Sequence, residues 1–410
     1  MRAVCWTLLI AGFTLTAGEQ LSADGEKPRT AIFELRDGDR VVLLGNTLVE
    51  RAQQYGYWET LLTARYPRRR VVFRNLGWSG DTVWAESRVL FDTPAKGYAR
   101  MLAHISKLKP TVVVLGYGGN EANAGRAGLR AFVKQYNRLL DDLTAASAPG
   151  VRFVILSPIR HENLGSPLPD PTRTNRKLAL WTRTLGDIAQ RRGCRFVDLF
   201  SPWKLPPEFT GRVPGGVPKH LTDDEMHLTA AGYFVTGVRI ASSLSLLTPP
   251  ADIRLTAEGR VVRSSRAKIS QLRVSGGRLS FQYQAETLHG LAGRLQIDGA
   301  PTRGYALRID GKRTVSATGR RWQSGVVLTD SPDVRQWERL RKAIVEKNRL
   351  YFYRWRPQNV TYLFLFRKHE QGQNAREIPL FDPLVAAKEK EIARLRQPIP
   401  HTSELAPLSR

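Results

Sequence analysis

Regular alternation of apolar and amphipathic segments is the feature that most constrains the fold of this chain. Residues 111–119, TVVVLGYGG, are apolar along almost their whole length, as in a strand buried on both faces of a sheet. The segments between such strands carry apolar residues at helical spacing, and prolines or glycines such as Pro67, Pro110 and Gly193 mark their ends. This alternation over residues 38–248 predicts a parallel sheet with helices on both faces.

The same pattern places the individual elements of this part of the chain. The expected strands are residues 40–44, 70–77, 111–119, 152–159 and 194–200. The expected helices are residues 47–67, 96–110, 129–146, 174–193 and 229–247.

A double proline at residues 249 and 250 marks a boundary, after which the composition changes. Short alternating segments such as KISQLRV and RLSFQYQ are broken by glycines over residues 251–330, which predicts a small antiparallel β module. We therefore expect an α/β domain, a β-rich module and a helical or extended C-terminal segment at residues 30–248, 251–332 and 333–410.

The C-terminal segment is expected to be helical from about residue 333 and again over residues 382–397. Between these helices, residues 351–374 are dense in aromatic side chains and arginines. Such side chains suit the binding of carboxylates and stacking on sugars. The alternative is a segment that packs back on the core with its charges outward.

The N-terminus has the layout of a signal peptide. Arg2 precedes an apolar run at residues 3–17 that is too short for a transmembrane helix, and small and polar residues follow. We expect residues 1–23 to be removed, no transmembrane segment to remain, and the protein to be exported to the periplasm or the extracellular space. Cys5 lies in this segment, so Cys194 is left alone and no intrachain disulfide is expected.

The chain carries a large positive charge, because 63 lysines and arginines stand against 37 aspartates and glutamates, a formal net charge of +26. This surplus favours anionic partners such as acidic polysaccharide, a membrane or wall surface, or nucleic acid. Basic blocks with interleaved aromatics of an RNA-binding type are lacking, as is zinc-finger spacing, which argues against nucleic acid. Clusters of cysteine and histidine with metal-ligand spacing are lacking too, so neither a metal nor a cofactor is expected.

Four polar, glycine-containing segments stand next to these strands and helices. Three of them follow the first three expected strands, and they should converge because ligands in open parallel sheets bind beyond the carboxyl ends of strands. In chain order the four are GNTL (45–48), RNLGWSGDTV (74–83), LGYGGNEA (115–122) and LTDDEMHLTAAGY (221–233).

The order of these segments resembles that of the blocks in the SGNH hydrolases, also called the GDSL esterase/lipase family, over residues 38–245. SGDT and GGNE are similar to the second and third blocks of that family, and DEMHLTAAGY is similar to its last block. The resemblance implies a flavodoxin-like three-layer αβα fold with a parallel sheet, to which the β-rich and helical C-terminal extension is added.

The resemblance also implies a role for individual residues. These are a nucleophile (Thr47), a general base oriented by a carboxylate (His227 and Asp224), an oxyanion hole (Gly80 and Asn120) and supporting positions (Gly45, Asn46, Asp81 and Gly119). Such a set suits acyl transfer, which needs an activated hydroxyl, a base within reach and donors aimed at the developing oxyanion. A simpler interpretation of Asn120 is that it caps a helix beginning near Glu121.

The first block departs from the family pattern, which has Gly-Asp-Ser where this chain has Gly45, Asn46 and Thr47. The extra methyl of threonine stiffens χ1 and crowds a tight turn, although its hydroxyl acts as a nucleophile when a base is well placed. Thr47 is therefore either the nucleophile or a residue that only hydrogen-bonds the turn. Ser79 offers a second hydroxyl beside Gly80, but in the wrong block.

We expect an exported ester hydrolase that acts on a small ester or on O-acetyl groups of a polysaccharide, with anionic substrates favoured by the charge. A lipid or acyl ester is the alternative substrate. Two alternatives are not enzymes: a catalytically silent protein of this fold that binds carbohydrate, and a basic adhesion protein that uses the fold as a scaffold.

Overall fold

The computed structural model describes residues 33–408 except residues 212, 214, 248, 291, 371 and 373. The expected signal peptide at residues 1–23 lies outside the described residues. Among the helices of the described part of the chain, none is long and apolar enough to cross a membrane.

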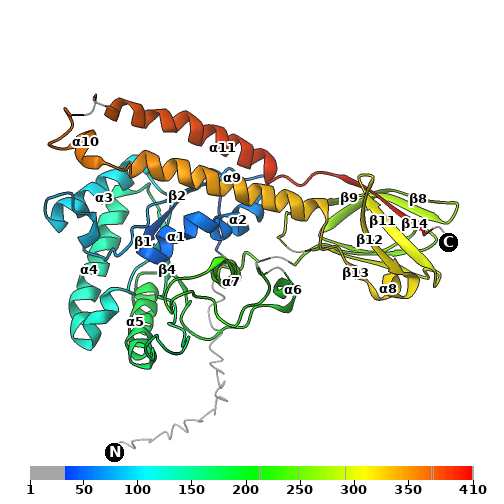
Figure 1. Cartoon of the computed structure of the whole chain (residues 1–410), viewed down its shortest axis with the longest axis horizontal. Helices are drawn as coiled ribbons and strands as arrows, with labels where there is room; N and C mark the ends of the chain where they lie inside the picture. The colour runs from blue at the N-terminus through cyan, green and yellow to red at the C-terminus, as the bar shows by residue number, and fades with distance from the viewer. Residues whose placement is uncertain are drawn as a thin grey trace, which may run out of the picture. The chain divides into compact units, whose positions relative to one another are not determined.

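A five-stranded parallel sheet forms the centre of the first half of the chain (Figure 1). Its strand order is β2-β1-β3-β4-β5, which is the flavodoxin-like order. Every pair is parallel, and Leu43 of β1 pairs with Asn75 of β2 on one side and Val114 of β3 on the other. The strands are β1 (Arg40–Gly45), β2 (Val72–Asn75), β3 (Val112–Gly116), β4 (Arg152–Leu156) and β5 (Arg195–Val197).

Successive residues of each strand enter two different hydrophobic cores, because side chains alternate between the faces of a sheet. Leu43 and Val114 contribute to the core that includes α1, α2 and α7, whereas Leu44 and Leu115 contribute to the core that includes α3, α4 and α5. The predicted three-layer arrangement is therefore confirmed. The helices are α1 (Thr47–Tyr55), α2 (Tyr57–Ala64), α3 (Pro94–Leu108), α4 (Gly125–Ala146), α5 (Thr172–Arg191), α6 (Pro207–Thr210) and α7 (Ala230–Ser243), with short 3-10 turns η1 (Glu86–Arg88) and η2 (Glu121–Ala124).

The prediction of a single helix over residues 47–67 is wrong, because Gly56 divides this segment into α1 and α2. Gly56 has φ +70°, and its N–H closes α1 on the carbonyl of Ala52. A Cβ at this position would lie 2.8 Å from Val345 Cγ2 of the C-terminal helix α9. Glycine therefore serves both the left-handed conformation and the close approach of α9.

Two further sheets share a third core that contains Leu255, Leu307 and Trp322. The first has the order β13-β10-β6-β7 and the second β12-β11-β14-β9-β8. The expectation of a wholly antiparallel module is wrong at one place, since β10 pairs with β6 in parallel. The strands are β6 (Asp252–Thr256), β7 (Val261–Ser265), β8 (Ala267–Ser275), β9 (Arg278–Ala285), β10 (Arg294–Asp298), β11 (Gly304–Ile309), β12 (Lys312–Thr318), β13 (Val326–Val327) and β14 (His401–Pro407), with helix α8 (Gly319–Ser324).

The C-terminal segment forms the long helix α9 (Pro332–Trp355), the short α10 (Val360–Phe364), the 3-10 turn η3 (Asn374–Leu380) and α11 (Phe381–Leu395), which runs beside α9 (Figure 1). Its last strand, β14, inserts between β9 and β11, a pairing that no pattern in the sequence indicated.

Helix α9 is joined to the α/β part of the chain by a buried ion pair. Lys347 Nζ lies 2.7 Å from Glu59 Oε1 of α2 and also donates to the carbonyl of Phe73. Asn348 adds a hydrogen bond to the same carboxylate. The carboxylate and the ammonium are both satisfied, so burial of the two charges is supported by hydrogen bonds as well as by their attraction.

Candidate active site

Thr47 stands where β1 turns into helix α1. Asn46 is the N-cap, and its side-chain oxygen accepts from the N–H of Leu48 at 3.1 Å, so Thr47 is the first residue of the helix. The positive end of the helix dipole thus lies at the Thr47 hydroxyl, a position that favours a negative charge. A Cβ on Gly45 would lie 2.5 Å from the carbonyl oxygen of Gly116, so this turn has no room for a side chain.

The second segment reaches Thr47 through Gly80. The Gly80 N–H donates to Thr47 Oγ1 at 3.1 Å, and the glycine has φ +75°, a conformation that other residues adopt only with strain. Asp81, next in the chain, is fully buried. Its carboxylate accepts from Arg88 Nε at 2.6 Å and from the Tyr117 hydroxyl at 3.1 Å, which anchors the loop that carries Gly80.

The third segment is tied to the second through Asn120. Its side-chain amide donates to the main-chain carbonyl of Asp81 at 2.9 Å, and it makes no capping hydrogen bond to the turn that follows. Asn120 thus stands at the N-cap position of η2, as the simpler interpretation expected, but its side chain does not cap that turn. A Cβ on Gly119 would lie 3.2 Å from Asn46 Nδ2, so a small residue at this position keeps the first and third segments in contact.

Glu121 also joins these two segments, a role that the sequence did not suggest. Its two carboxylate oxygens accept from the N–H groups of Val83, at 2.9 Å, and Gly118, at 2.8 Å. Burial raises the pKa of Glu121 to about 7 despite these hydrogen bonds, and the nearby Asp81 adds to the rise.

In the fourth segment, Asp224 and His227 form a hydrogen-bonded pair. His227 Nδ1 lies 2.5 Å from Asp224 Oδ2, and the His227 N–H donates to Asp224 Oδ1 at 2.8 Å. Partial burial by itself would raise the pKa of Asp224, but the hydrogen bonds from His227 outweigh it, and the pKa is lowered. The ionised carboxylate thus holds the imidazole through Nδ1, and Nε2 makes no hydrogen bond to any residue that the structure describes.

Two contacts that the sequence did not predict join the fourth segment to helix α1. Arg51, one turn along α1 from Thr47, lies 3.7 Å from Asp223, and the Tyr233 hydroxyl donates to the carbonyl of Leu48 at 2.9 Å. The fourth segment therefore packs on the same helix that begins with Thr47. Within the part of the chain that the structure describes, no hydrogen bond joins the side chains of Thr47 and His227.

Glu162 positions the fourth segment from the other side. One of its carboxylate oxygens accepts from the main-chain N–H groups of Leu221 and Thr222 and from the Thr222 hydroxyl. Its neighbour His161 interacts electrostatically with Asp224 and His227, and burial lowers its pKa. The sequence could have indicated both Glu162 and His161, because they stand just after the fourth expected strand, at the edge of a parallel sheet where ligands bind.

Asp223, Asp224 and His227 are the one group of side chains in the described chain with the proximity of a metal site, their candidate ligand atoms lying within 4.8 Å of one another. His227 Nδ1 and Asp224 Oδ2 already bond each other, so a metal ion at these atoms would break that pair.

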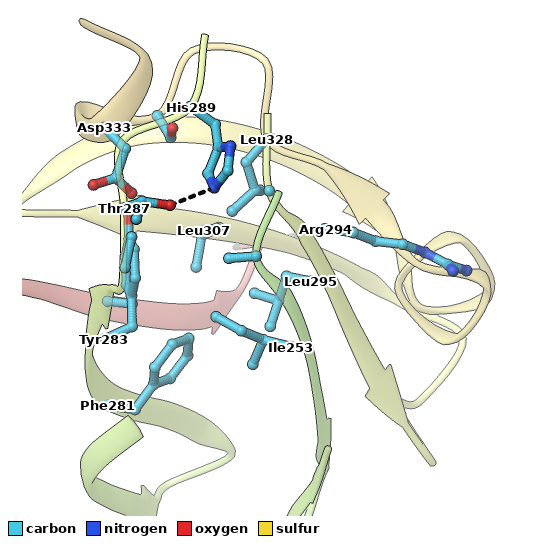
Figure 2. Close-up of a pocket in the computed structure, with 15 residues that line it drawn as sticks. Ile253, Phe281, Tyr283, Thr287, His289, Arg294, Leu295, Leu307, Leu328 and Asp333 are labelled. Atoms are coloured by element: carbon cyan, nitrogen blue, oxygen red, sulfur yellow. Dashed lines mark hydrogen bonds between the residues drawn. The ribbon is translucent and has the colours of Figure 1, made fainter. Parts of the chain in front are cut away.

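A cavity between the two C-terminal sheets does not suit a substrate. Its volume is about 30 Å³, which is room for about one water molecule. Figure 2 shows Thr287, His289 and Asp333 on its polar side and Phe281, Ile253 and Leu295 on its apolar side. Thr287 Oγ1 and His289 Nε2 bond each other at 2.8 Å, and burial lowers the pKa of His289 to about 4.

Residues 43–234 match the GDSL-like lipase/acylhydrolase family, and all four segments lie within this range. This match confirms the resemblance to the GDSL, or SGNH, hydrolases for residues 43–234.

Among solved structures, the chain is similar to a gut microbial diltiazem-metabolizing enzyme, with 14% identity and a TM-score of 0.69 over 92% of this chain and 99% of that one. At this identity the likeness shows the fold alone, including the fold of the C-terminal region. Shorter matches include the acetylxylan esterase Axe2 from Geobacillus stearothermophilus (18% identity, TM-score 0.37, 51% of this chain and 95% of that one) and a GDSL-like lipase from Bacteroides thetaiotaomicron (17%, 0.34, 50% and 88%). No curated protein sequence matches this chain.

Proposed function

We propose that this protein hydrolyses carboxylic esters through an acyl-enzyme formed on Thr47. The observation that supports it best is the position of the Thr47 hydroxyl, which lies at the N-terminus of α1 and accepts from the Gly80 N–H at 3.1 Å. The Asp224–His227 pair belongs to a segment held on the same helix.

In this proposal Thr47 Oγ1 attacks the ester carbonyl while His227 Nε2 takes the hydroxyl proton. Asp224 keeps the other ring nitrogen, Nδ1, protonated and stabilises the imidazolium that forms. The imidazolium then donates its proton to the departing alcohol. A water molecule activated by the same imidazole releases the acyl group and restores the Thr47 hydroxyl.

The oxyanion is stabilised by two donors. The Gly80 N–H already lies beside the attacking oxygen, so a carbonyl oxygen bonded to the same carbon comes within its reach. One N–H of the Asn120 amide is held by the carbonyl of Asp81, which orients the second N–H. Asp81 and Glu121 stabilise the loops that present these donors.

For the substrate we propose an acetylated or other small-acyl ester of an anionic carrier such as an acidic polysaccharide. The formal charge of +26 supports an anionic carrier, since it raises the local concentration of negatively charged molecules. Export to the periplasm or beyond, inferred from the N-terminal residues, would place the protein where such polysaccharides occur.

A second candidate function is carbohydrate binding without turnover. The missing hydrogen bond between Thr47 and His227 in the described structure supports it, as does the methyl group that Thr47 adds to the turn. Catalytic hydrogen bonds are often long or absent before substrate binds, which is why we favour the enzyme.

The two functions are separated by the rate of p-nitrophenyl acetate hydrolysis in the wild type and in three variants. Thr47→Ala and His227→Ala should reduce kcat by roughly 10² or more, because the nucleophile or the base is lost. Ser79→Ala is the matched control and should leave the rate unchanged, since its exposed hydroxyl lies in the wrong segment. A wild-type rate no higher than that of Thr47→Ala would overturn the enzyme and leave the binding protein.

A further inference from the structure

A cavity of about 330 Å³ lies beside the segment that carries Gly80. One wall comes from this segment and helix α3, and the other from the end of α9 and from α10. The residues that decide its chemistry are Trp78, Arg88, Arg100, Lys107, Trp355 and Arg356. Its volume falls at the lower end of the range of about 300–1,000 Å³ that is usual for small-molecule sites.

The lining of the cavity is cationic. It contains three arginines and one lysine, and no aspartate or glutamate. Arg88 is bound to Asp81, and Arg100 makes two contacts with Asp92. Lys107 has no carboxylate partner within the described chain, so its charge is available to a ligand.

One further donor of the lining is unsatisfied. The buried indole N–H of Trp355 has no hydrogen-bond acceptor in the part of the chain that the structure describes. Arg356 Nη1 lies 3.2 Å from Glu50 Oε2, so its charge is shared with that carboxylate. Buried donors normally have a partner, and a ligand with several acceptor oxygens would provide one.

The rest of the lining is apolar and aromatic. The rings of Trp78 and Trp355 meet edge to face with their centres 5.9 Å apart, and the Arg356 guanidinium lies 3.7 Å from the centre of the Trp78 ring. Met101 and Phe364 complete this surface. Aromatic faces of this kind bind flat rings, whether aromatic rings or the apolar face of a sugar.

We propose that this cavity binds a carboxylate attached to a ring, with the ring against Trp355 and Phe364 and the carboxylate at Lys107 and Arg356. Either an acidic sugar or an aromatic acid supplies this chemistry. Two contacts link the cavity to the candidate active site. The main-chain N–H of Trp78 donates to the carbonyl of Gly45 at 2.9 Å, and Glu50, which pairs with Arg356, lies one turn from Thr47. The role of the cavity as a substrate subsite rests on the proposed esterase function, and it restricts the substrate to esters that carry such an acid. Binding of the acid itself does not require turnover.

The test is calorimetric titration of the full chain at pH 7 in the Thr47→Ala background, so that failure of catalysis does not affect the result. Glucuronate and 1-naphthoate are the two carboxylate probes, and glucose and 1-naphthalenemethanol are their neutral counterparts. We expect one carboxylate to bind at least about tenfold more tightly than its neutral counterpart, as for a hydrogen bond to a charged group. Binding of glucuronate would identify the ligand as an acidic sugar, and binding of 1-naphthoate would identify it as an aromatic acid.

Two pairs of variants localise the binding. Lys107→Glu should weaken binding of the carboxylate by about tenfold or more. Lys96→Glu makes the same charge change on an exposed residue of α3 outside the lining, and it should leave the affinity unchanged. Ala103→Trp should fill the cavity and abolish binding, whereas Ser106→Trp on the same helix should not. The proposal is overturned if neither carboxylate binds, if the neutral compounds bind equally well, or if the lining variants behave like their controls.

Discussion

The backbone N–H of Gly80 donates a 3.1 Å hydrogen bond to the side-chain oxygen of Thr47, across 33 positions of sequence. Gly80 follows β2 and Thr47 follows β1, and these strands are neighbours in the parallel sheet. Because the Thr47 oxygen accepts this bond, its own hydrogen remains free to be donated to a base. The contact therefore leaves the hydroxyl in a state that suits a nucleophile.

The first prediction concerns the methyl group of Thr47. Thr47→Ser should raise kcat for p-nitrophenyl acetate by roughly two- to tenfold, because removing the constraint on χ1 relieves about 0.5–1.5 kcal/mol of rotamer energy during attack. Steady-state kinetics with both proteins check it. A serine variant slower than the wild type would indicate that the methyl group helps to place the hydroxyl.

The second prediction concerns the carboxylate beside His227. Asp224→Asn should reduce kcat by roughly 10²–10⁴, because the amide no longer holds the imidazole in the required tautomer. Asp223→Asn, one position earlier, should change kcat by less than about threefold, since Asp223 only makes an exposed ion pair with Arg51 at 3.7 Å. An equal decrease of kcat in the two variants would show that the hydrogen bond from Asp224 to His227 has no particular role in catalysis.

The third prediction concerns the pH dependence of stability that arises from Glu121. Its pKa is about 7 in the folded protein, whereas a solvent-exposed glutamate has a pKa of 4.5, so the folded state keeps a proton that the unfolded state releases between these values. The free energy of unfolding should therefore decrease as pH rises from about 4.5 to about 7, by at most roughly 3 kcal/mol.

Urea denaturation of the wild type and Glu121→Gln at pH 5, 6, 7 and 8 checks this dependence. The variant does not titrate, so the difference between the two proteins should become smaller toward pH 8. The variant should be less stable at pH 5 because its amide NH₂ faces a backbone N–H, at a cost of about 1–3 kcal/mol. If the free energies of unfolding of the two proteins change with pH in parallel, the pH dependence arises from groups other than Glu121.

The fourth prediction concerns the buried ion pair between α2 and α9. Lys347→Met should lower the free energy of unfolding by about 3–5 kcal/mol, because the buried Glu59 carboxylate loses its counter-charge. Adding Glu59→Gln should recover most of this loss, since no charge is then buried and Asn348 keeps an acceptor. Lys342→Met, at an exposed position of the same helix, should change stability by less than about 0.5 kcal/mol. Chemical denaturation measures all three.

The positions of the polar segments were predictable because they depend on strand ends. Strands 40–44 and 111–119 were recognisable from their continuous apolar character, and in a parallel sheet the carboxyl ends of neighbouring strands meet at one edge. The sequence alone therefore led to the expectation that Thr47, Gly80 and Asn120 lie in one region. Their roles in catalysis stay predictions that the variants above test.

Other parts of the site could not be predicted because no local pattern encodes them. Glu121 bonds to Val83 and Arg51 pairs with Asp223, and these partners are far apart in the chain with ordinary spacing around them. The break at Gly56 was missed for a similar reason. A glycine within an amphipathic pattern is compatible with one helix, and only the approach of Val345 shows why the chain turns there.

By itself, the sequence determined the alternation of strands and helices, the order of the four polar segments and the family they resemble, because each depends on residues close together in the chain. Tertiary structure decided how the C-terminal region is used: β14 inserts between β9 and β11, Lys347 pairs with Glu59, and Arg356 covers Trp78 beside Gly80. Most of these contacts join residues about one hundred or more positions apart. They exist only because burial of the shared cores brings the segments together, and the free energy of that burial has no local signature.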